Sequence, residues 1–394
     1  MFSPLLLLAA PLFLQSEPDA PPLFNWKFNG RYAMDTRSPW PLDGSSTLNR
    51  GTARFRMATD IHPTSFLSVT LEGEHLDSGE DTDDQFHQAY LDFHLDSLKG
   101  SSLRLGQMEF SRGKERMLSR RYFSINGLAW RGALLQIPVG SWKADFFQFE
   151  PAPNKGWEHA DDGLGGVYAT GYFQDMPVDI YGLFRTQGNL DLSDTTVGIL
   201  LQSSPPSASG EWNWNLETAF QTGDMTTGSS GGLALAALSE WKLGYVTWLG
   251  LGLDYAAGPS SGGSGFQPLY NSWFYDLGHS GIVNWSNLLD LSLRLRTRAS
   301  DSGFWSAGVH FLNKAASGPA SLLPGAENPH EPLPQDETEK YIGTEMDLVF
   351  HHTFETKTKT KLLLGLSHFN PGPALPGSDS QSWLWLNFGF GYQP

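Results

Sequence analysis

The sequence predicts an all-β fold, a single antiparallel transmembrane β-barrel of about eighteen strands. The first observation is alternation: within Leu289–Arg296, LDLSLRLR, every second side chain is Leu and the others are polar. A period of two is that of a β-strand with one apolar and one polar face. Weaker versions recur along the chain in segments of about ten residues, the length that crosses a bilayer as a tilted strand.

The individual strands follow from this alternation. Four further segments show it clearly: 50–57, 66–75, 86–96 and 211–222. The last strand places apolar side chains on one face: Leu384, Leu386, Phe388, Phe390 and Tyr392. Between 233 and 247 two strands must be divided near Lys242 without an obvious turn, so a count of about sixteen is the alternative; both numbers are even, as in single-chain bacterial barrels.

The connections are the second observation, because short and long ones alternate. Short turns are expected at 61–64, 97–100, 138–140, 175–176 and 204–207. Long loops are expected at 76–84, 111–126, 150–162, 223–232, 258–281, 314–340 and 371–381. With a periplasmic N-terminus, the short turns are periplasmic and the long loops extracellular, which is the pattern of outer-membrane barrels.

Composition is the third observation. The 394 residues include 43 glycines and 25 prolines, which favours many strands and turns. A mean hydropathy of −0.30, with no internal run of roughly 20 apolar residues, excludes a multi-helix membrane protein. The net charge of −16 argues against nucleic-acid binding. Without cysteine, thiol catalysis, Cys-ligated zinc and a lipoprotein anchor are excluded, and we predict no cofactor and no metal.

The N-terminus predicts a secretory signal peptide at 1–20, followed by the barrel at 21–394. Its apolar segment, 5–14, is short and contains a proline, and no basic residue precedes it. Cleavage is expected after Ser16 or Ala20. A hydrophobic N-terminal strand or tail is the alternative interpretation.

Aromatic residues concentrate near predicted strand ends. They are Phe24, Trp26, Phe28, Trp142, Phe146, Phe147, Trp383 and Trp385. At the membrane interfaces they would form girdles; packing within a water-soluble β core is the alternative.

Charged side chains on the polar row are the candidate functional residues. The basic candidates for lining the pore and binding anions are Lys27, Arg31, Arg50, Arg54, Arg56, Arg104, Arg131, Arg294 and Arg296. The acidic candidates are Glu72, Glu74, Asp92, Glu217, Asp290, Glu345 and Asp347. An arginine fork matches a carboxylate bidentately, so a row of arginines would pass a uronic-acid polymer along. Cross-strand salt bridges that only keep the lumen polar are an equally weighted reading.

Other motifs predict little chemistry. The acidic loop Asp77–Asp84 lacks the ligand spacing of a calcium loop, so a solvated loop is favoured over a divalent cation that bridges lipopolysaccharide. Gly258–Gly262 matches G-x-S-x-G without the strand–turn–helix context of a nucleophile elbow. Residues 315–339 form an extracellular loop, with a lid as one role. We predict that the protein is not an enzyme.

Three ordered stretches resemble the alginate export family of outer-membrane barrels. They are Leu103–Phe110 with Gly113–Leu118, then Asp254–Gly258 with Phe266–Tyr270, and Tyr341–Leu348 with Leu366–Gly372. Gln107, Arg112, Lys114 and Arg131 depart from the family pattern. The resemblance covers about residue 25 to the C-terminus and implies an eighteen-stranded monomer that passes an anionic polysaccharide outward.

We therefore expect an outer-membrane channel that exports or conducts anionic polysaccharide, alginate-like, or sugar acids. Its expected partners are outer-membrane lipid and lipopolysaccharide, the substrate and periplasmic export components. A general diffusion porin is the nearest alternative. A secreted all-β glycan-binding protein is the alternative from another class.

Overall fold

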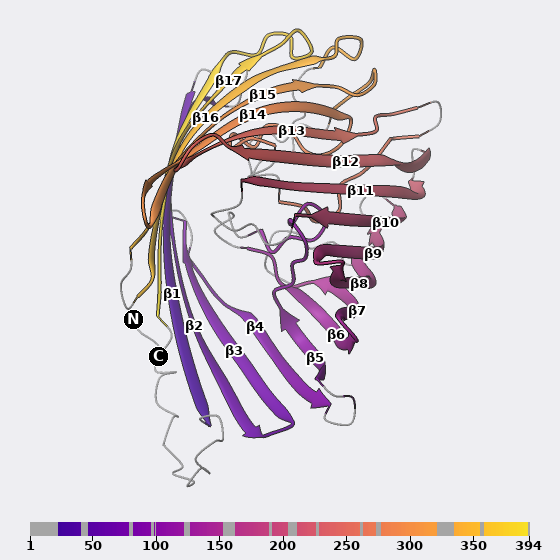
Figure 1. Cartoon of the computed structure of the whole chain (residues 1–394), viewed down its shortest axis with the longest axis vertical. Helices are drawn as coiled ribbons and strands as arrows, with labels where there is room; N and C mark the ends of the chain where they lie inside the picture. Colours follow the sequence, from indigo (N-terminus) through magenta and orange to yellow (C-terminus); the bar gives the residue numbers. More distant parts are fainter. Residues whose placement is uncertain are drawn as a thin grey trace.

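The computed structural model describes most of the chain. The described residues are 23–40, 46–78, 82–95, 98, 100–121, 127–152, 162–188, 191–203, 211–225, 228–260, 263–272, 277–320, 335–354 and 358–392. They form one 18-stranded antiparallel sheet, in which each strand pairs with its neighbours in the sequence. The sheet closes because β1 pairs with β18 as well as with β2 (Figure 1). The predicted fold class is thereby confirmed; the predicted signal peptide lies outside the described residues.

The strands follow one another in chain order. They are β1 (Phe24–Trp40), β2 (Ser46–Thr64), β3 (Leu67–Asp77), β4 (Thr82–Leu95), β5 (Ser101–Met108), β6 (Trp130–Val139), β7 (Trp142–Pro151), β8 (Gly163–Phe173), β9 (Met176–Gln187), β10 (Leu192–Gln202), β11 (Trp212–Met225), β12 (Gly228–Lys242), β13 (Thr247–Ala256), β14 (Leu288–Ser300), β15 (Gly303–Asn313), β16 (Tyr341–Phe354), β17 (Thr360–Pro371) and β18 (Gln381–Tyr392). Among the described residues no helix is long and apolar enough to cross a membrane.

The strand boundaries settle several expectations. β12 ends at Lys242 and β13 begins at Thr247, so the division predicted near Lys242 is right. Two predicted long loops are wrong: strands occupy most of 223–232 and all but the tip of 76–84. Their polar residues extend the ladder, as in the pairing of Asp224 with Ser229. Likewise β2 continues to Thr64, beyond the expected start of its turn.

Short and long connections do separate to opposite rims. β1 begins beside the end of β18, where the rings of Trp26 and Tyr392 lie 5.4 Å apart. The short turns, such as those between β6 and β7 and between β8 and β9, lie at this rim. The long connections, β5–β6, β13–β14 and β15–β16, lie at the other rim.

The side-chain rows follow the alternation of the sequence. On β14, Leu291, Leu293 and Leu295 are 43–49% exposed on the outer face, whereas Asp290 and Ser292 are buried in the interior. Three predicted girdle residues break the expectation. Phe147 is buried on the inward row of β7, and Trp383 and Trp385 are buried and share the inward row of β18 with Asn387. The outward row of that strand is the Leu384–Phe388 row, so by parity these indoles face the lumen.

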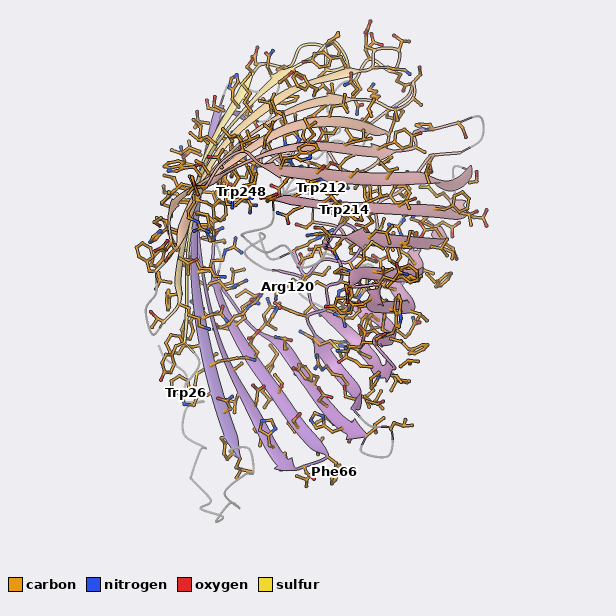
Figure 2. The ribbon with its side chains drawn as sticks, viewed as in Figure 1. Trp26, Phe66, Arg120, Trp212, Trp214 and Trp248 are labelled. Atoms are coloured by element: carbon orange, nitrogen blue, oxygen red, sulfur yellow. The ribbon has the colours of Figure 1, made fainter. Side chains whose placement is uncertain are left out.

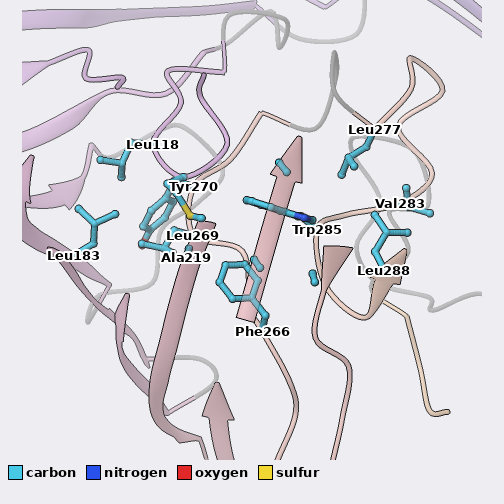
Figure 3. Close-up of a cluster of buried hydrophobic side chains, with 14 of the residues drawn as sticks. Leu118, Leu183, Ala219, Phe266, Leu269, Tyr270, Leu277, Val283, Trp285 and Leu288 are labelled. Carbon is cyan, nitrogen blue, oxygen red and sulfur yellow. The ribbon is translucent and has the colours of Figure 1, made fainter. Parts of the chain in front are cut away.

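Two long connections fold into the barrel. The first inward loop comprises residues 109–121 and 127–129, and the second comprises 257–260, 263–272 and 277–287. Leu118 and Tyr270 form a parallel bridge between them, in which Ser119 N donates to Tyr270 O over 2.8 Å. Apolar side chains from both loops and from the wall pack into one cluster with Phe266 and Trp285 (Figure 3). The barrel therefore contains an apolar core within its lumen.

Candidate functional site: a belt across the lumen and a charged wall

Within the two inward loops, residues 109–121, 263–272 and 277–287 form a belt. One end is tied to the wall through Glu109, whose Oε1 lies 2.8 Å from Arg56 Nη1. The other end crosses to β1, where Arg37 Nη1 donates to Ser280 O over 3.1 Å. Both ties reach adjacent strands, since Arg37 lies on β1 and Arg56 on β2. The part of the lumen between the belt and this wall is called the opening below.

A carboxylate also fastens the far end of the belt. Glu345 on β16 accepts hydrogen bonds from the backbone N–H groups of His279, over 2.6 Å, and Ser280, over 2.7 Å. The Ser280 hydroxyl donates to the same carboxylate. Gly278 adopts a φ of +88°, and a Cβ there would collide with Glu345, so glycine is required at this turn.

The wall opposite the belt carries a group of arginines. Arg31 on β1 and Arg54 on β2 are direct cross-strand partners, and Arg56 follows Arg54 on the same row. Arg31 Nε donates to Asn387 Oδ1 over 2.6 Å, which fixes its guanidinium. Four residues further along the same two strands, Arg50 Nη2 lies 3.0 Å from Asp35 Oδ2. Cations thus stand side by side on adjacent strands.

Carboxylates on the next strand partly balance this charge. Arg56 Nε lies 2.5 Å from Glu74 Oε2, and its Nη1 lies 3.9 Å from Glu72 Oε1. A ladder of cations interrupted by carboxylates holds an anion less tightly than cations alone, which favours release.

The belt contributes its own cation to the opening. Figure 2 labels Arg120 near the middle of the barrel, and its side chain is 44% exposed. Its guanidinium lies 3.6 Å from Glu109 Oε2 and 3.8 Å from Glu115 Oε1. Arg120 is therefore oriented by two carboxylates while much of its surface faces the open lumen.

Ionisation at the belt follows from these contacts. Burial raises the pKa of Glu109, but the hydrogen bond from His87 and the charge of Arg56 outweigh it and lower that pKa to about 2. Burial lowers the pKa of Arg121 to about 9. Both groups remain charged near neutral pH, so the electrostatics of the belt are fixed.

The structure places most of the sequence-predicted residues on inward rows. The inward basic residues are Lys27, Arg31, Arg50, Arg54, Arg56, Arg104, Arg294 and Arg296, and the inward acidic residues are Glu72, Glu74, Asp92, Glu217, Asp290, Glu345 and Asp347. They do not form one site. Arg31, Arg54, Arg56 and the two glutamates of β3 gather on adjacent strands, whereas Glu217, Glu345 and Asp347 contact the belt elsewhere.

Several of the other predicted residues lie in separate ion pairs. Lys27 Nζ lies 3.6 Å from Asp60, and Arg104 Nη2 lies 2.8 Å from Asp92. Glu217 lies 3.4 Å from the belt's Arg116. The remaining pairs join Asp290 to His310 over 2.7 Å and Arg296 to Glu240 over 3.6 Å.

Arg131 corrects the prediction. Its side chain is 49% exposed and lies 3.7 Å from Glu150, which is 59% exposed, on the outward row of β6. The inward row holds Trp130, whose ring lies 4.5 Å from that of Tyr270 in the belt. On β6 the apolar Trp130 therefore faces the lumen, where it packs against the belt, and the charged Arg131 faces outward.

Sequence reasoning missed His87, Glu109, Arg116 and Arg120. One signal for His87 was present: Phe86 falls on the polar row of the 86–96 segment, where Gln88, Tyr90 and Asp92 alternate. The apolar side chain indicates a break in register. The other three lie on the first inward loop, where no periodicity assigns a direction.

The other motifs and polar groups considered do not form a reactive site among the described residues. The neighbouring residues His279 and Ser280 contact different carboxylates: the Ser280 hydroxyl donates to Glu345, and His279 Nδ1 lies 3.4 Å from Asp347. The Gly258–Gly262 and Asp77–Asp84 motifs fall partly outside the described residues. Within the described ranges, no group of three His, Asp or Glu side chains could hold a metal ion.

Comparisons with known proteins agree with this architecture. A sequence model of a family described as "Alginate export" matches residues 67–382. The fold is similar to Pseudomonas aeruginosa OccK11 (OpdR), with a TM-score of 0.66 and 11% identity over 94% of this chain and 96% of that one. P. aeruginosa OccK2 (OpdF), solved in complex with glucuronate, gives a TM-score of 0.66 at 10% identity, with 94% and 96% coverage. Acinetobacter baumannii OccAB1 gives a TM-score of 0.66 at 11% identity, with the same coverage. No curated protein matches the sequence.

Proposed function

The chain belongs to the alginate export family and is a channel of the bacterial outer membrane, and we propose that it conducts anionic polysaccharide or sugar acids. Transport by this route needs no covalent chemistry, so we propose that the protein is not an enzyme. We also propose that it works as a monomer, since the opening is enclosed by one chain. Outer-membrane lipid and lipopolysaccharide would surround it.

The observation that carries this proposal is the opening between belt and wall. Arg31 and Arg54 lie side by side on the inward rows of adjacent strands, where they are largely buried, and Arg120 stands on the belt side with an exposed guanidinium. Guanidinium groups bind carboxylates in a planar, bidentate manner, so cations on both sides favour a flat anionic sugar. The complex of OccK2 with glucuronate supports this class of substrate by likeness of fold only.

Release is supported by the intervening carboxylates. Glu72 and Glu74 compete for Arg56, so an incoming uronate at this position would replace existing partners without entering a site of unpaired cations. Conduction requires sites that bind well enough to admit a solute and weakly enough to release it. The mixture of arginines and carboxylates on the wall supports both conditions.

Ionic current through the purified protein in a planar bilayer tests the proposal. We expect polyuronate to block the current, and an Arg54→Glu/Arg294→Glu variant to lose the block. Arg131→Glu, a matched charge reversal on the outer face, should keep it. Unblocked current with free passage of neutral sugars would instead identify a general diffusion porin, and a protein soluble as a monomer without detergent would contradict any channel.

A further inference from the structure

We propose that His87 is the positioning residue of the constriction: it joins the arginine wall to the belt and thereby fixes Arg120 in the lumen. The inference rests on the proposed function, because it concerns the same opening. It goes beyond that function because it states which residue holds the belt in place, a buried imidazole that touches no substrate.

A β-bulge places His87 in the lumen. Glu72 pairs with Gln88 whereas Gly73 pairs with Phe86, so β4 has one extra residue at His87. Phe86 is 61% exposed on the outer face, while His87 is fully buried. The side chains of His87 and Gln88 both reach inward, to Glu109 and Glu72 respectively. Bulges redirect side chains in this way at the rims of barrels and beside functional sites.

The neighbours of His87 fix its tautomer. Arg56 Nη2 lies 3.2 Å from Nδ1, and a guanidinium can only donate, so Nδ1 accepts and carries no proton. Nε2 therefore carries the proton and donates to Glu109 Oε1 over 2.7 Å. Glu74 Oε2 lies 3.8 Å from Nδ1, beyond hydrogen-bond reach. The imidazole thus links wall and belt in one direction, from Arg56 through His87 to Glu109.

The same imidazole supports both limbs of the first inward loop. Glu109 is the first residue after β5, and Gly127 lies on the returning limb. A Cβ on Gly127 would lie 3.6 Å from His87 Cε1 and 3.2 Å from Arg56 Nη2. Leu128 N donates to Arg120 O over 2.8 Å, which ties the returning limb to Arg120. The position of Arg120 therefore depends on His87 through its partner Glu109 and through the loop backbone.

Two near-isosteric substitutions separate positioning from general packing. In His87→Gln the amide N–H lies near the place of Nε2 and still reaches Glu109. In His87→Asn the amide oxygen lies near the place of Nδ1 and meets Arg56, but no donor reaches Glu109. Both variants are small, polar and neutral, so a residue that only fills space would tolerate or reject them together.

A spin label reports the position of the belt without any substrate. The chain has no cysteine, so Lys114→Cys, an exposed position on the belt, gives a single labelling site. We expect His87→Gln to give the label mobility of the wild type, and His87→Asn to give a several-fold more mobile label. His75→Asn, whose imidazole pairs with Asp84 away from the belt, is the control and should leave the label mobility unchanged.

Bilayer recordings provide the second readout. His87→Asn should show broader potassium chloride conductance levels and several-fold weaker polyuronate block, and His87→Gln should behave as the wild type. Equal label mobility in the two His87 variants would overturn the assignment. Polyuronate that fails to block the wild type would contradict the proposed substrate class and leave the label result as an independent test of positioning.

Discussion

The two sides of the lumen are built differently. The inward rows of β1–β4 carry buried arginines and carboxylates, including Arg54 and Glu74. The facing interior over β6–β9 presents Trp130, Phe149 and Leu183 on the same inward rows, and the belt covers them. Where the loops pack against the wall, much of the inward row becomes an apolar core, and the polar side chains that remain there are buried in pairs such as Arg185 with Asp194.

The two sides of the lumen contribute differently to the belt. Burying apolar side chains on the packed side contributes about 25 cal/mol per Å² and holds the loops in the barrel. Buried ion pairs on the charged side add little net stability, because desolvation offsets much of their attraction. The apolar side therefore keeps the belt in place, and the charged side determines where its cation points.

Removing Trp130 from the packed side should have the largest effect. Trp130→Ala leaves a cavity against Tyr270 and Phe149, so we expect a loss of about 3–5 kcal/mol in the free energy of unfolding. Urea unfolding in lipid vesicles measures it, and conductance should rise as the belt loosens. Phe146→Ala on the lipid-facing row of β7 is the control. Equal losses in the two variants would mean that the interior core does not secure the belt.

Removing the cation between the carboxylates should have the next largest effect. Arg56→Gln leaves Glu74 and Glu72 without their charged partner, and we expect a loss of about 1.5–3 kcal/mol in the free energy of unfolding. Arg104→Gln, which breaks the more exposed pair with Asp92, should cost less. The same unfolding assay compares them, and the reverse order would contradict the role of burial.

Acid should weaken the tie between wall and belt. The folded-state pKa of Glu109, about 2, lies below its ordinary value of 4.5, so the ionised form stabilises the fold above pH 4.5. That contribution is lost as the pH falls from 4.5 towards 2. Glu109→Gln lacks it and should show a flatter dependence of unfolding free energy on pH in this window. Parallel curves for the variant and the wild type would contradict the assignment.

Changing Arg131 should have the smallest effect. Its ion pair with Glu150 is about half exposed on the outer face, and such pairs contribute about 0–1 kcal/mol. We expect Arg131→Gln to leave unfolding, conductance and polyuronate block near the wild-type values. A clear change in ion selectivity would place this side chain on the conduction path after all.

The sequence predicted the barrel well because alternation is a local property. Each strand shows which row is apolar, and on β14 this reading holds for Leu291 and Asp290 alike. It failed for Arg131 and Trp385, because the loop residues that contact those rows, Tyr270 at Trp130 and His279 at Trp385, are far away in the chain. It failed also for Trp383, which is buried beside Val349 and Trp385 of the wall. The candidate site could be predicted on the strands, at Arg31, Arg54 and Arg56, and not on the belt, where Glu109 and Arg120 follow no period.

The bridge between Leu118 and Tyr270 has a consequence for how the protein matures. These residues belong to connections on either side of eight strands, β6 to β13, so they meet only when that part of the sheet has formed. Contacts between such distant segments are slow to form. The newly inserted barrel would first exist as a wide, leaky cylinder and narrow only afterwards. A freshly assembled molecule and a finished one would then differ in what they let through, although their strands are the same.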